Sequence, residues 1–286
     1  MAWQTIRYAV SGDVGVVTLH RPEALNTYSV RMRDELHELL SCIRAEVMAR
    51  DHHGGAGCCE EGEVGRDAAA VEGVRALLFQ GAGPTAFCAG ADLSEFLTAP
   101  SVDAARNIRR VRDLWRLLGE MPAPLIAAVH GYVLGSGLEI ALACDVRMAA
   151  ADAVFGLPEM GLGILPGVGG TQRVPRTMAP AHALDMLLTG RRFDAHEALA
   201  RGLITRVVPA ARLCAQALEL AQRLADAPAA ALHGARQAIK QGAELSLAQG
   251  LRLEARLAGR LAHRTHALHA AHAPRVFPSE FHAESI

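Results

Sequence analysis

The chain has 286 residues, of which 51% are hydrophobic and 21% are charged, and this composition excludes an intrinsically disordered protein. With 29 Lys and Arg against 30 Asp and Glu, the net charge of -1 argues against a general polyanion binder. The six cysteines lack the spacing of a disulfide framework or a zinc site, and the N-terminus lacks a secretory signal. We therefore expect a reduced, cytoplasmic protein with no membrane span and no bound metal.

The N-terminal elements are predicted from two kinds of hydrophobic spacing. Residues 3–20 alternate between polar and apolar side chains and predict a β-hairpin that turns at 11–13. Residues 28–49 place apolar side chains at helical intervals, and Ser29 is positioned to cap this helix. Residues 51–72 are polar, acidic and rich in glycine, which predicts a flexible insertion loop. Its glycines also argue against a preorganised metal site on its histidines and cysteines.

The rest of the chain predicts an alternation of strands and helices that gives way to helices alone. Apolar runs at 74–80 and 125–129 predict buried strands, and a glycine-containing loop is expected at 131–137. The last part of the chain is almost purely helical in its pattern. This order predicts an α/β fold with a core at 1–200 and a C-terminal helical segment at 201–286.

Two segments combine the end of a buried strand, small residues and the start of a helix: FCAGADL at 87–93 and HGYVLGSGLE at 130–139. Small residues allow a ligand to approach the backbone closely, and a new helix offers unpaired N–H groups at its positive end. Two such groups that converge can stabilise an oxyanion. The alternative is that the small residues only permit tight packing between strand and helix.

Two glutamates lie in apolar surroundings. Glu139 is flanked by aliphatic residues, and Glu159 lies in a run punctuated by glycine and proline at 155–173. Burial of a carboxylate raises its pKa unless partner charges compensate, and such carboxyl groups serve as acids and bases near neutral pH. The alternative is that each glutamate pairs with an arginine, for which Arg147 and Arg173 are the candidates.

Five segments, in their order and spacing, resemble the enoyl-CoA hydratase/isomerase (crotonase) superfamily, and most of all its enoyl-CoA hydratases. The resemblance runs over nearly all of residues 3–240. It implies a spiral of repeated ββα units with a C-terminal helical segment that mediates trimerisation, and trimers of this superfamily commonly pair into hexamers. The matching segments are RPEALN at 21–26, FCAGADL at 87–93, HGYVLGSGLEIALACD at 130–145, FGLPEMGLGILPGVGGTQRVPR at 155–176 and LTGRRFDAHEALARGLITRVVP at 188–209.

The resemblance also implies a role for each residue that stands out. The backbone N–H groups of Ala91 and Ser136 would hold the thioester oxygen of an acyl-CoA, although glycine is commoner than serine at the second position. Glu139 would deprotonate a water for attack at C3, and Glu159 would protonate C2. The implied reaction is the syn addition of water across the 2,3 double bond of a 2-enoyl-CoA. The product would be a 3-hydroxyacyl-CoA, as in fatty-acid β-oxidation.

The resemblance makes coenzyme A part of the substrate, so no cofactor is expected. Arg21 is a candidate for binding a phosphate of CoA, because it lies close to Ala24 in the sequence segment 21–26. Leu114 and Leu118 are candidates for the acyl tail, but we favour core packing for both. Substrate contacts are expected from Ala24, Ala89, Asp92, Leu93, Trp115 and Met160, and further acyl-tail candidates are Phe96, Leu162 and Leu165.

Other functions stay open at this point. Many double-bond isomerases of the superfamily keep only the second glutamate, so the presence of both favours a hydratase, although other CoA-ester lyases keep both. An arginine-rich helix at 106–116 suggests a second hypothesis, that the chain is a non-catalytic member of the superfamily that binds RNA. Asp103 and Asp113 lie in the same stretch and favour a solvated, salt-bridged face instead. We therefore expect an acyl-CoA partner, no nucleic acid or membrane partner, and a homotrimer or hexamer.

Overall fold

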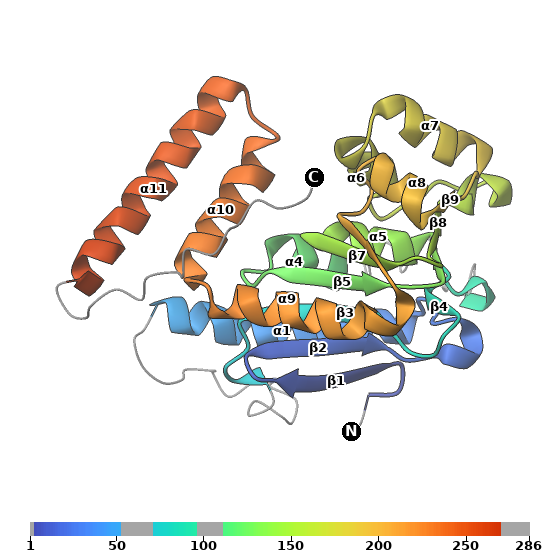
Figure 1. Cartoon of the computed structure of the whole chain (residues 1–286), viewed down its shortest axis with the longest axis horizontal. Helices are drawn as coiled ribbons and strands as arrows, with labels where there is room; N and C mark the ends of the chain where they lie inside the picture. The colour runs from blue at the N-terminus through green and yellow to red at the C-terminus, as the bar shows by residue number, and fades with distance from the viewer. Residues whose placement is uncertain (1–2, 53–70, 96–110, 270–286) are drawn as a thin grey trace. The chain divides into compact units, whose positions relative to one another are not determined.

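The computed structural model describes residues 3–52, 71–95 and 111–269. Contacts within the chain divide it into two compact units, 1–229 and 230–286 (Figure 1). The first unit extends past the predicted boundary at 200 because β10 (Arg206–Val208) pairs with β7 (Val146–Ala150), and α9 (Leu213–Asp226) packs on the same sheet. The second unit comprises α10 (Ala229–Gly242), apart from its first residue, and α11 (Leu247–His269).

The first unit is built on two sheets. The larger sheet has a largely parallel order, and only its first pair of strands is antiparallel. Its order is β1 (Ile6–Ser11), β2 (Val14–Leu19), β3 (Ala76–Gly81), β5 (Leu125–Val129), β7 and β10. The smaller sheet has the order β4 (Ala86–Cys88), β6 (Tyr132–Leu134), β8 (Val154–Gly156) and β9 (Phe193–Asp194).

From β3 to β8, consecutive strands alternate between the two sheets. β3, β5 and β7 are neighbours in the larger sheet, and each is followed in the chain by β4, β6 or β8 in the smaller one. Each pair of strands therefore advances both sheets by one position before the chain turns into a helical segment. This arrangement confirms the predicted α/β class and the spiral of repeated ββα units.

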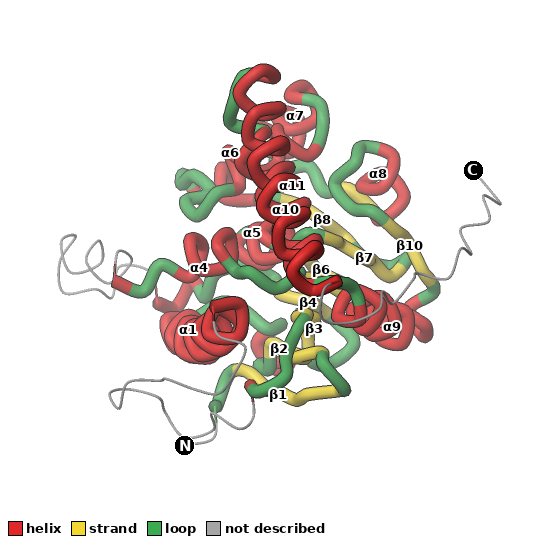
Figure 2. The backbone as a smooth tube through the Cα atoms, turned by 90° about the vertical axis from the view of Figure 1, so that its left-hand side faces the viewer, coloured by secondary structure: helices red, strands yellow, loops and turns green. Residues whose placement is uncertain are grey.

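The larger sheet separates two layers of helices. On one face, Leu77 and Phe79 of β3 pack in a buried cluster with α1 (Val30–His52), α4 (Leu114–Glu120) and α5 (Ser136–Ala143). On the other face, Ala76 and Leu78 pack with the apolar side of α9. Figure 2 shows α1 and α9 on opposite sides of β2 and β3. The alternation of side chains along β3 thus fills both layers, as expected for a strand buried on both faces.

Shorter helices complete the first unit. α8 (Ala195–Ala200) packs on β8 and β9 of the smaller sheet, α6 (Gly170–Thr177) packs on α5, and α7 (Pro180–Thr189) packs on α6. The single-turn helices are η1 (Pro22–Ala24), η2 (Leu93–Glu95), η3 (Pro158–Leu162) and η4 (Ala210–Arg212). In the described ranges, no helix combines the length and apolar character needed to cross a bilayer.

Most of the predicted elements are confirmed, and one is wrong. The hairpin, the buried strand at 125–129 and the helical C-terminal pattern are present, and Ser29 Oγ accepts the Met32 N–H at 3.1 Å as a helix cap. The loop expected at 131–137 instead contains β6, and α5 already begins at Ser136. A strand of three residues is too short to show a period of its own. Most of the predicted insertion loop, 53–70, lies outside the described residues.

Candidate active site

The candidate site lies at the carboxyl ends of β4, β6 and β8, which are parallel neighbours in the smaller sheet. β4 runs into residues 89–91, β6 into Gly135 and Ser136, and β8 into residues 157–159. The carboxyl ends of parallel strands meet at one edge of a sheet, which is the usual place for a ligand in open α/β sheets. Three segments that are far apart in the sequence therefore come together here.

Two glycines bring the first two segments into close contact. Gly90 and Gly135 have positive φ angles of 114° and 50°, which glycine adopts without a steric penalty. A Cβ atom on Gly135 would lie 3.4 Å from Gly90 Cα, and one on Gly90 would lie 3.9 Å from Gly135 Cα. The next residues, Ala91 and Ser136, therefore start from adjacent points of the backbone. Among the described residues, neither of their N–H groups donates to a protein acceptor.

The direction of the Ala91 N–H group is set by a bridge to Tyr28. The Tyr28 N–H donates to Gly90 O at 2.8 Å, and the Asp92 N–H donates to Tyr28 O at 2.9 Å. Backbone polar groups of successive residues in an extended segment point to opposite sides. Because Gly90 and Asp92 use their groups on residue 28, the Ala91 N–H points away from it and stays available to a ligand.

Ser136 offers the second free N–H group as the first residue of α5. The first N–H groups of a helix have no intrahelical acceptor and lie at the positive end of its dipole. Serine is tolerated at position 136 because the residue with the positive, left-handed φ angle is Gly135. In the described ranges, positive φ outside glycine is confined to Leu25 and Asn26. Serine at 136 therefore introduces no left-handed strain.

Glu139 lies one turn into α5 and is only 1% exposed. Its Oε1 atom accepts hydrogen bonds from Gly170 N at 2.6 Å and Val168 N at 3.2 Å. Burial, together with the negative charge of Glu159, raises the pKa of the Glu139 carboxyl to about 7, although these hydrogen bonds oppose the rise. A carboxyl group with this pKa exchanges a proton readily at neutral pH.

Glu159 lies in η3 beside the same glycine that precedes Ser136. A Cβ atom on Gly135 would lie 2.8 Å from Glu159 Oε1, so only glycine leaves room for this carboxyl group. Within the described part of the chain, the buried Oε2 atom has no hydrogen-bond partner. Burial raises the pKa of the Glu159 carboxyl above its ordinary value. A buried oxygen without a partner is costly to the fold, and it is the state expected of a group that awaits a ligand.

The alternative interpretation is that the glutamates pair with Arg147 and Arg173, but in the described part of the chain neither arginine forms an ion pair with either glutamate. Arg147 donates to the carbonyl oxygens of Leu203 at 2.7 Å and Cys144 at 2.9 Å. Arg173 donates to Val168 O at 2.9 Å, and its positive charge lowers the pKa of Glu139 without an ion pair. Arg173 therefore holds the backbone segment that binds Glu139 rather than the carboxylate itself.

The segment RPEALN lies against the residues that follow β4. The Ala89 N–H donates to Leu25 O at 3.1 Å, which brings the predicted substrate contacts Ala24 and Ala89 into neighbouring stretches of backbone. Asn26 is fully buried, and its Nδ2 atom donates to Ala82 O and Ala86 O, each at 2.8 Å. The segment is thereby fixed to the start of β4.

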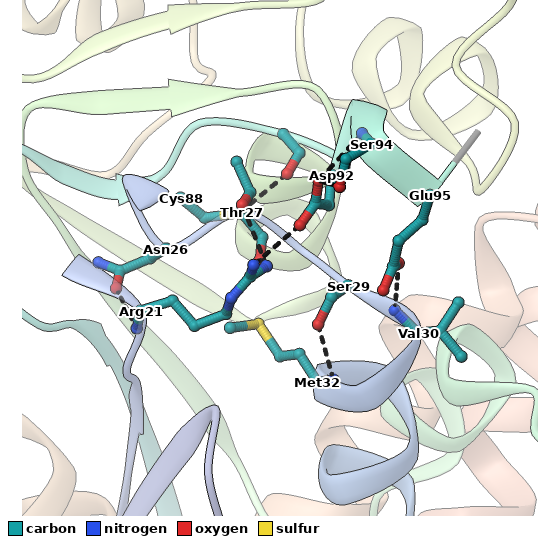
Figure 3. A network of polar contacts seen from close by, with 11 residues as sticks. Arg21, Asn26, Thr27, Ser29, Val30, Met32, Cys88, Asp92, Ser94 and Glu95 are labelled. Carbon is teal, nitrogen blue, oxygen red and sulfur yellow. Dashed lines mark hydrogen bonds and ion pairs between the residues drawn. The ribbon is translucent and has the colours of Figure 1, made fainter. Parts of the chain in front are cut away.

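The remaining predicted substrate residues differ in their surroundings. Leu93 is 55% exposed and Met160 is 39% exposed, so both apolar side chains are accessible. Trp115 is partly buried, with its ring centroid 5.7 Å from that of Tyr28. Asp92 is already engaged by Arg21 and Ser94 (Figure 3).

The other acyl-tail candidates divide into core and surface residues. Leu114 and Leu118 are buried in the main cluster, which confirms the core packing favoured for them. Leu162 and Leu165 are exposed. Phe96 and most of the predicted arginine-rich helix lie outside the described residues. Of that helix, Arg112 pairs with Asp34 at 3.3 Å and Arg116 with Glu120 at 3.7 Å.

Sequence reasoning missed the backbone donors to Glu139 and the ion pair between Arg21 and Asp92. The signal for the donors was the glycine run before Thr171, since a helix that starts on glycine can place its N–H groups close to a side chain. No spacing in the sequence predicts a pair separated by 71 residues. Among the described residues, no group of three or more His, Cys, Asp and Glu side chains could hold a metal ion.

Comparison with known proteins identifies the family of the chain. The family model for enoyl-CoA hydratase/isomerase matches residues 66–273, and the chain therefore belongs to that family. It is 36% identical over 257 residues to "Probable enoyl-CoA hydratase" of Rhizobium meliloti, covering 90% of this chain and 89% of the relative.

The chain is also similar to a second curated hydratase and to a solved hydratase structure. The chain is 35% identical to "Short-chain-enoyl-CoA hydratase" of Clostridium acetobutylicum, over 87% of this chain and 85% of that one. The crystal structure of an enoyl-CoA hydratase from Bacillus anthracis matches the fold with a TM-score of 0.77 at 33% identity. It covers 93% of this chain and 95% of that one. The family and the spiral fold inferred from the sequence motifs are confirmed.

Proposed function

We propose that this enzyme of the enoyl-CoA hydratase/isomerase family is an enoyl-CoA hydratase that adds water across the 2,3 double bond of a 2-enoyl-CoA. One observation carries the proposal. The carboxyl groups of Glu139 and Glu159 lie at the same strand edge as the free N–H groups of Ala91 and Ser136. An acid/base pair beside two converging donors is what hydration of a conjugated thioester needs.

Glu139 and Glu159 share the proton transfers in this proposal. Ionised Glu139 takes a proton from water, and the water oxygen forms a bond to C3. The electron pair of the double bond moves toward the thioester, and Glu159 gives its proton to C2 as the enolate collapses. Both hydrogen bonds to Glu139 end on Oε1, and among the described residues none reaches Oε2, which supports a water position there. In this proposal the water and the proton reach the same face of the double bond, so the addition is syn.

The N–H groups of Ala91 and Ser136 stabilise the charge that builds on the thioester oxygen. They are fixed before the substrate arrives, so no reorganisation is needed as the charge develops. The CoA portion lies along Ala24 and Ala89 in this proposal, and Leu93, Trp115 and Met160 face the substrate. Neither a cofactor nor a metal takes part in these steps, because the carboxyl groups and the backbone supply all the proton transfers and charge stabilisation.

We also propose a cytoplasmic homotrimer, or a hexamer of paired trimers. Apolar side chains of the second unit support assembly, since Ile239, Leu247 and Leu251 are 73%, 80% and 55% exposed. Exposed aliphatic residues of this size on two helices are typical of a surface that another chain covers.

The test is the loss of 2-enoyl thioester absorbance with crotonyl-CoA. Wild type should consume the substrate, and Glu139→Gln and Glu159→Gln should each lose activity by a factor on the order of 10² to 10⁴, the usual contribution of a general acid or base. Glu197→Gln removes a carboxylate of α8 that pairs with Arg191 and Arg201, and it serves as the control. An isomerase that uses Glu159 alone would tolerate Glu139→Gln. Absence of turnover by wild type on short, long and branched enoyl-CoA would contradict the proposal.

A further inference from the structure

The segment that carries the Ala91 N–H group is held from one side only. Gly90, with its φ of 114°, precedes it, and the Gly90–Ala91 peptide group is held through Gly90 O, which accepts the Tyr28 N–H at 2.8 Å. On the ligand side, no described residue accepts a hydrogen bond from Ala91. The direction of this N–H group therefore depends on contacts that lie behind it, at Tyr28 and Asp92.

Arg21 and Asp92 provide a charged contact behind the segment. Arg21 Nη2 lies 2.8 Å from Asp92 Oδ2, and the two side chains are 22% and 16% exposed. Arg21 Nη1 also donates to Thr27 O at 2.9 Å and to Thr27 Oγ1 at 3.2 Å. One guanidinium group thus binds a neighbour of each member of the bridge, Thr27 beside Tyr28 and Asp92 beside Ala91. Figure 3 shows Arg21 between Thr27 and Asp92.

The other atoms of this pair are fixed as well. The Arg21 N–H donates to Asn26 Oδ1 at 2.8 Å, and the Asn26 N–H donates to Arg21 O at 2.8 Å. Asp92 Oδ1 accepts from Ser94 Oγ at 2.6 Å and Ser94 N at 3.1 Å. Both carboxylate oxygens of Asp92 therefore have protein partners, and Asn26 anchors the arginine backbone to β4.

We infer that the Arg21–Asp92 ion pair is a positioning device for the oxyanion hole. It holds Asp92 and residues 27–28 together, and the Tyr28 N–H then fixes the Gly90–Ala91 peptide so that the Ala91 N–H group points at the thioester oxygen. Neither side chain touches the substrate. The inference rests on the proposed function, because it assigns a role within the same site. It replaces direct substrate contact by Asp92, and phosphate binding by Arg21, as the interpretation of these residues.

The kinetic test compares Asp92→Asn with Glu197→Gln. Each change neutralises one carboxylate of a partly buried ion pair, since the Arg201–Glu197 side chains are 19% and 21% exposed. Asp92→Asn should displace the Ala91 N–H group by a fraction of an ångström. This displacement should lower kcat roughly tenfold to a hundredfold. KM should stay within about twofold, as expected when only a transition-state interaction is lost. Glu197→Gln should keep the wild-type kcat.

Three further variants, Asp92→Glu, Arg21→Gln and a double variant, test whether the residues act as a pair. Asp92→Glu keeps the charge and should recover part of the lost kcat. The double variant Arg21→Gln with Asp92→Asn should lose little more than either single variant, because residues that act through one contact are not additive. Additive losses, or a loss of kcat in Glu197→Gln equal to that in Asp92→Asn, would overturn the inference.

A spectroscopic test separates this inference from the proposed function. Butyryl-CoA labelled with ¹³C at the carbonyl is saturated and is not hydrated, so its infrared carbonyl band reports polarisation in the bound state. Wild type should shift this band to lower frequency, and Asp92→Asn should give a clearly smaller shift at an unchanged Kd. If Asp92→Asn shifts the band as far as wild type does, whether or not it binds butyryl-CoA more weakly, the inference is overturned while the proposed function stands. No shift and no hydration by wild type would contradict the proposed function itself.

Discussion

Glu139 is the residue at which function and stability oppose each other. Its carboxyl is 1% exposed, and its pKa is raised from 4.5 to about 7, chiefly by burial. A raised carboxyl pKa means that the folded state disfavours the ionised form. Stability associated with this group is fully present below pH 4.5 and is lost as the pH rises toward 7. The charge that serves catalysis therefore weakens the fold.

Glu139→Gln should stabilise the protein at high pH and not at low pH. Above pH 7 the gain should be on the order of 3 kcal/mol, because the fold raises the pKa of this carboxyl from 4.5 to about 7. Gln keeps an oxygen that can accept from Val168 N and Gly170 N. Urea unfolding of both proteins at pH 5 and pH 8 measures the difference. A stability difference that does not change with pH would contradict this account of Glu139.

Gly135 should tolerate no side chain. An alanine Cβ would lie 2.8 Å from Glu159 Oε1, and φ of 50° is strained for alanine. Gly135→Ala should therefore lower the rate of hydration at least tenfold by displacing Glu159 or the Ser136 N–H group. Gly161→Ala is the matched control in η3, because no atom lies within 4 Å of an added Cβ there. Equal activity of the two variants would refute this packing argument.

At the scale of elements, the residues of the site could be predicted from the sequence, but the strand pairing that brings them together could not. The motifs around Ala91, Ser136, Glu139 and Glu159 were recognisable because each combines a strand end with small residues or an isolated carboxylate. Their convergence depends on β4, β6 and β8, and such short strands carry too few residues to reveal a period. The pairing of Arg21 with Asp92 could not be predicted either, because it depends on how the fold places the segment after β4 against the segment after β2.

The start of α6 should control how Glu139 titrates. Arg173 binds Val168 O, and the same backbone segment donates to Glu139 Oε1. Its positive charge also lowers the Glu139 pKa. Arg173→Gln should therefore raise this pKa and move the rising limb of the pH profile for kcat/KM to higher pH, with a several-fold loss of activity at pH 7. Arg173→Lys should move the limb less. An unmoved limb in both variants would show that Arg173 has no electrostatic role.

At the scale of the molecule, the described site belongs entirely to the first unit, and the second unit presents exposed aliphatic residues. If assembly covers them, the protein in solution should have three or six times the chain mass of 30.3 kDa. Leu247→Glu combined with Leu251→Glu places charges one turn apart on α11 and should yield smaller species. Analytical ultracentrifugation measures both masses. A wild-type monomer, or an unchanged mass in the variant, would contradict the assembly we propose.

The central claim is that this strand edge adds water to a 2-enoyl-CoA with two glutamates. The most direct measurement is mass spectrometry of the product from 2-hexenoyl-CoA in ¹⁸O-labelled water, with wild type, Glu139→Gln and Glu159→Gln side by side. We predict a 3-hydroxyacyl-CoA that carries one ¹⁸O atom at C3 from wild type, and almost none from either variant. A product with the mass of the substrate and a displaced double bond, or full labelling by Glu139→Gln, would contradict the account.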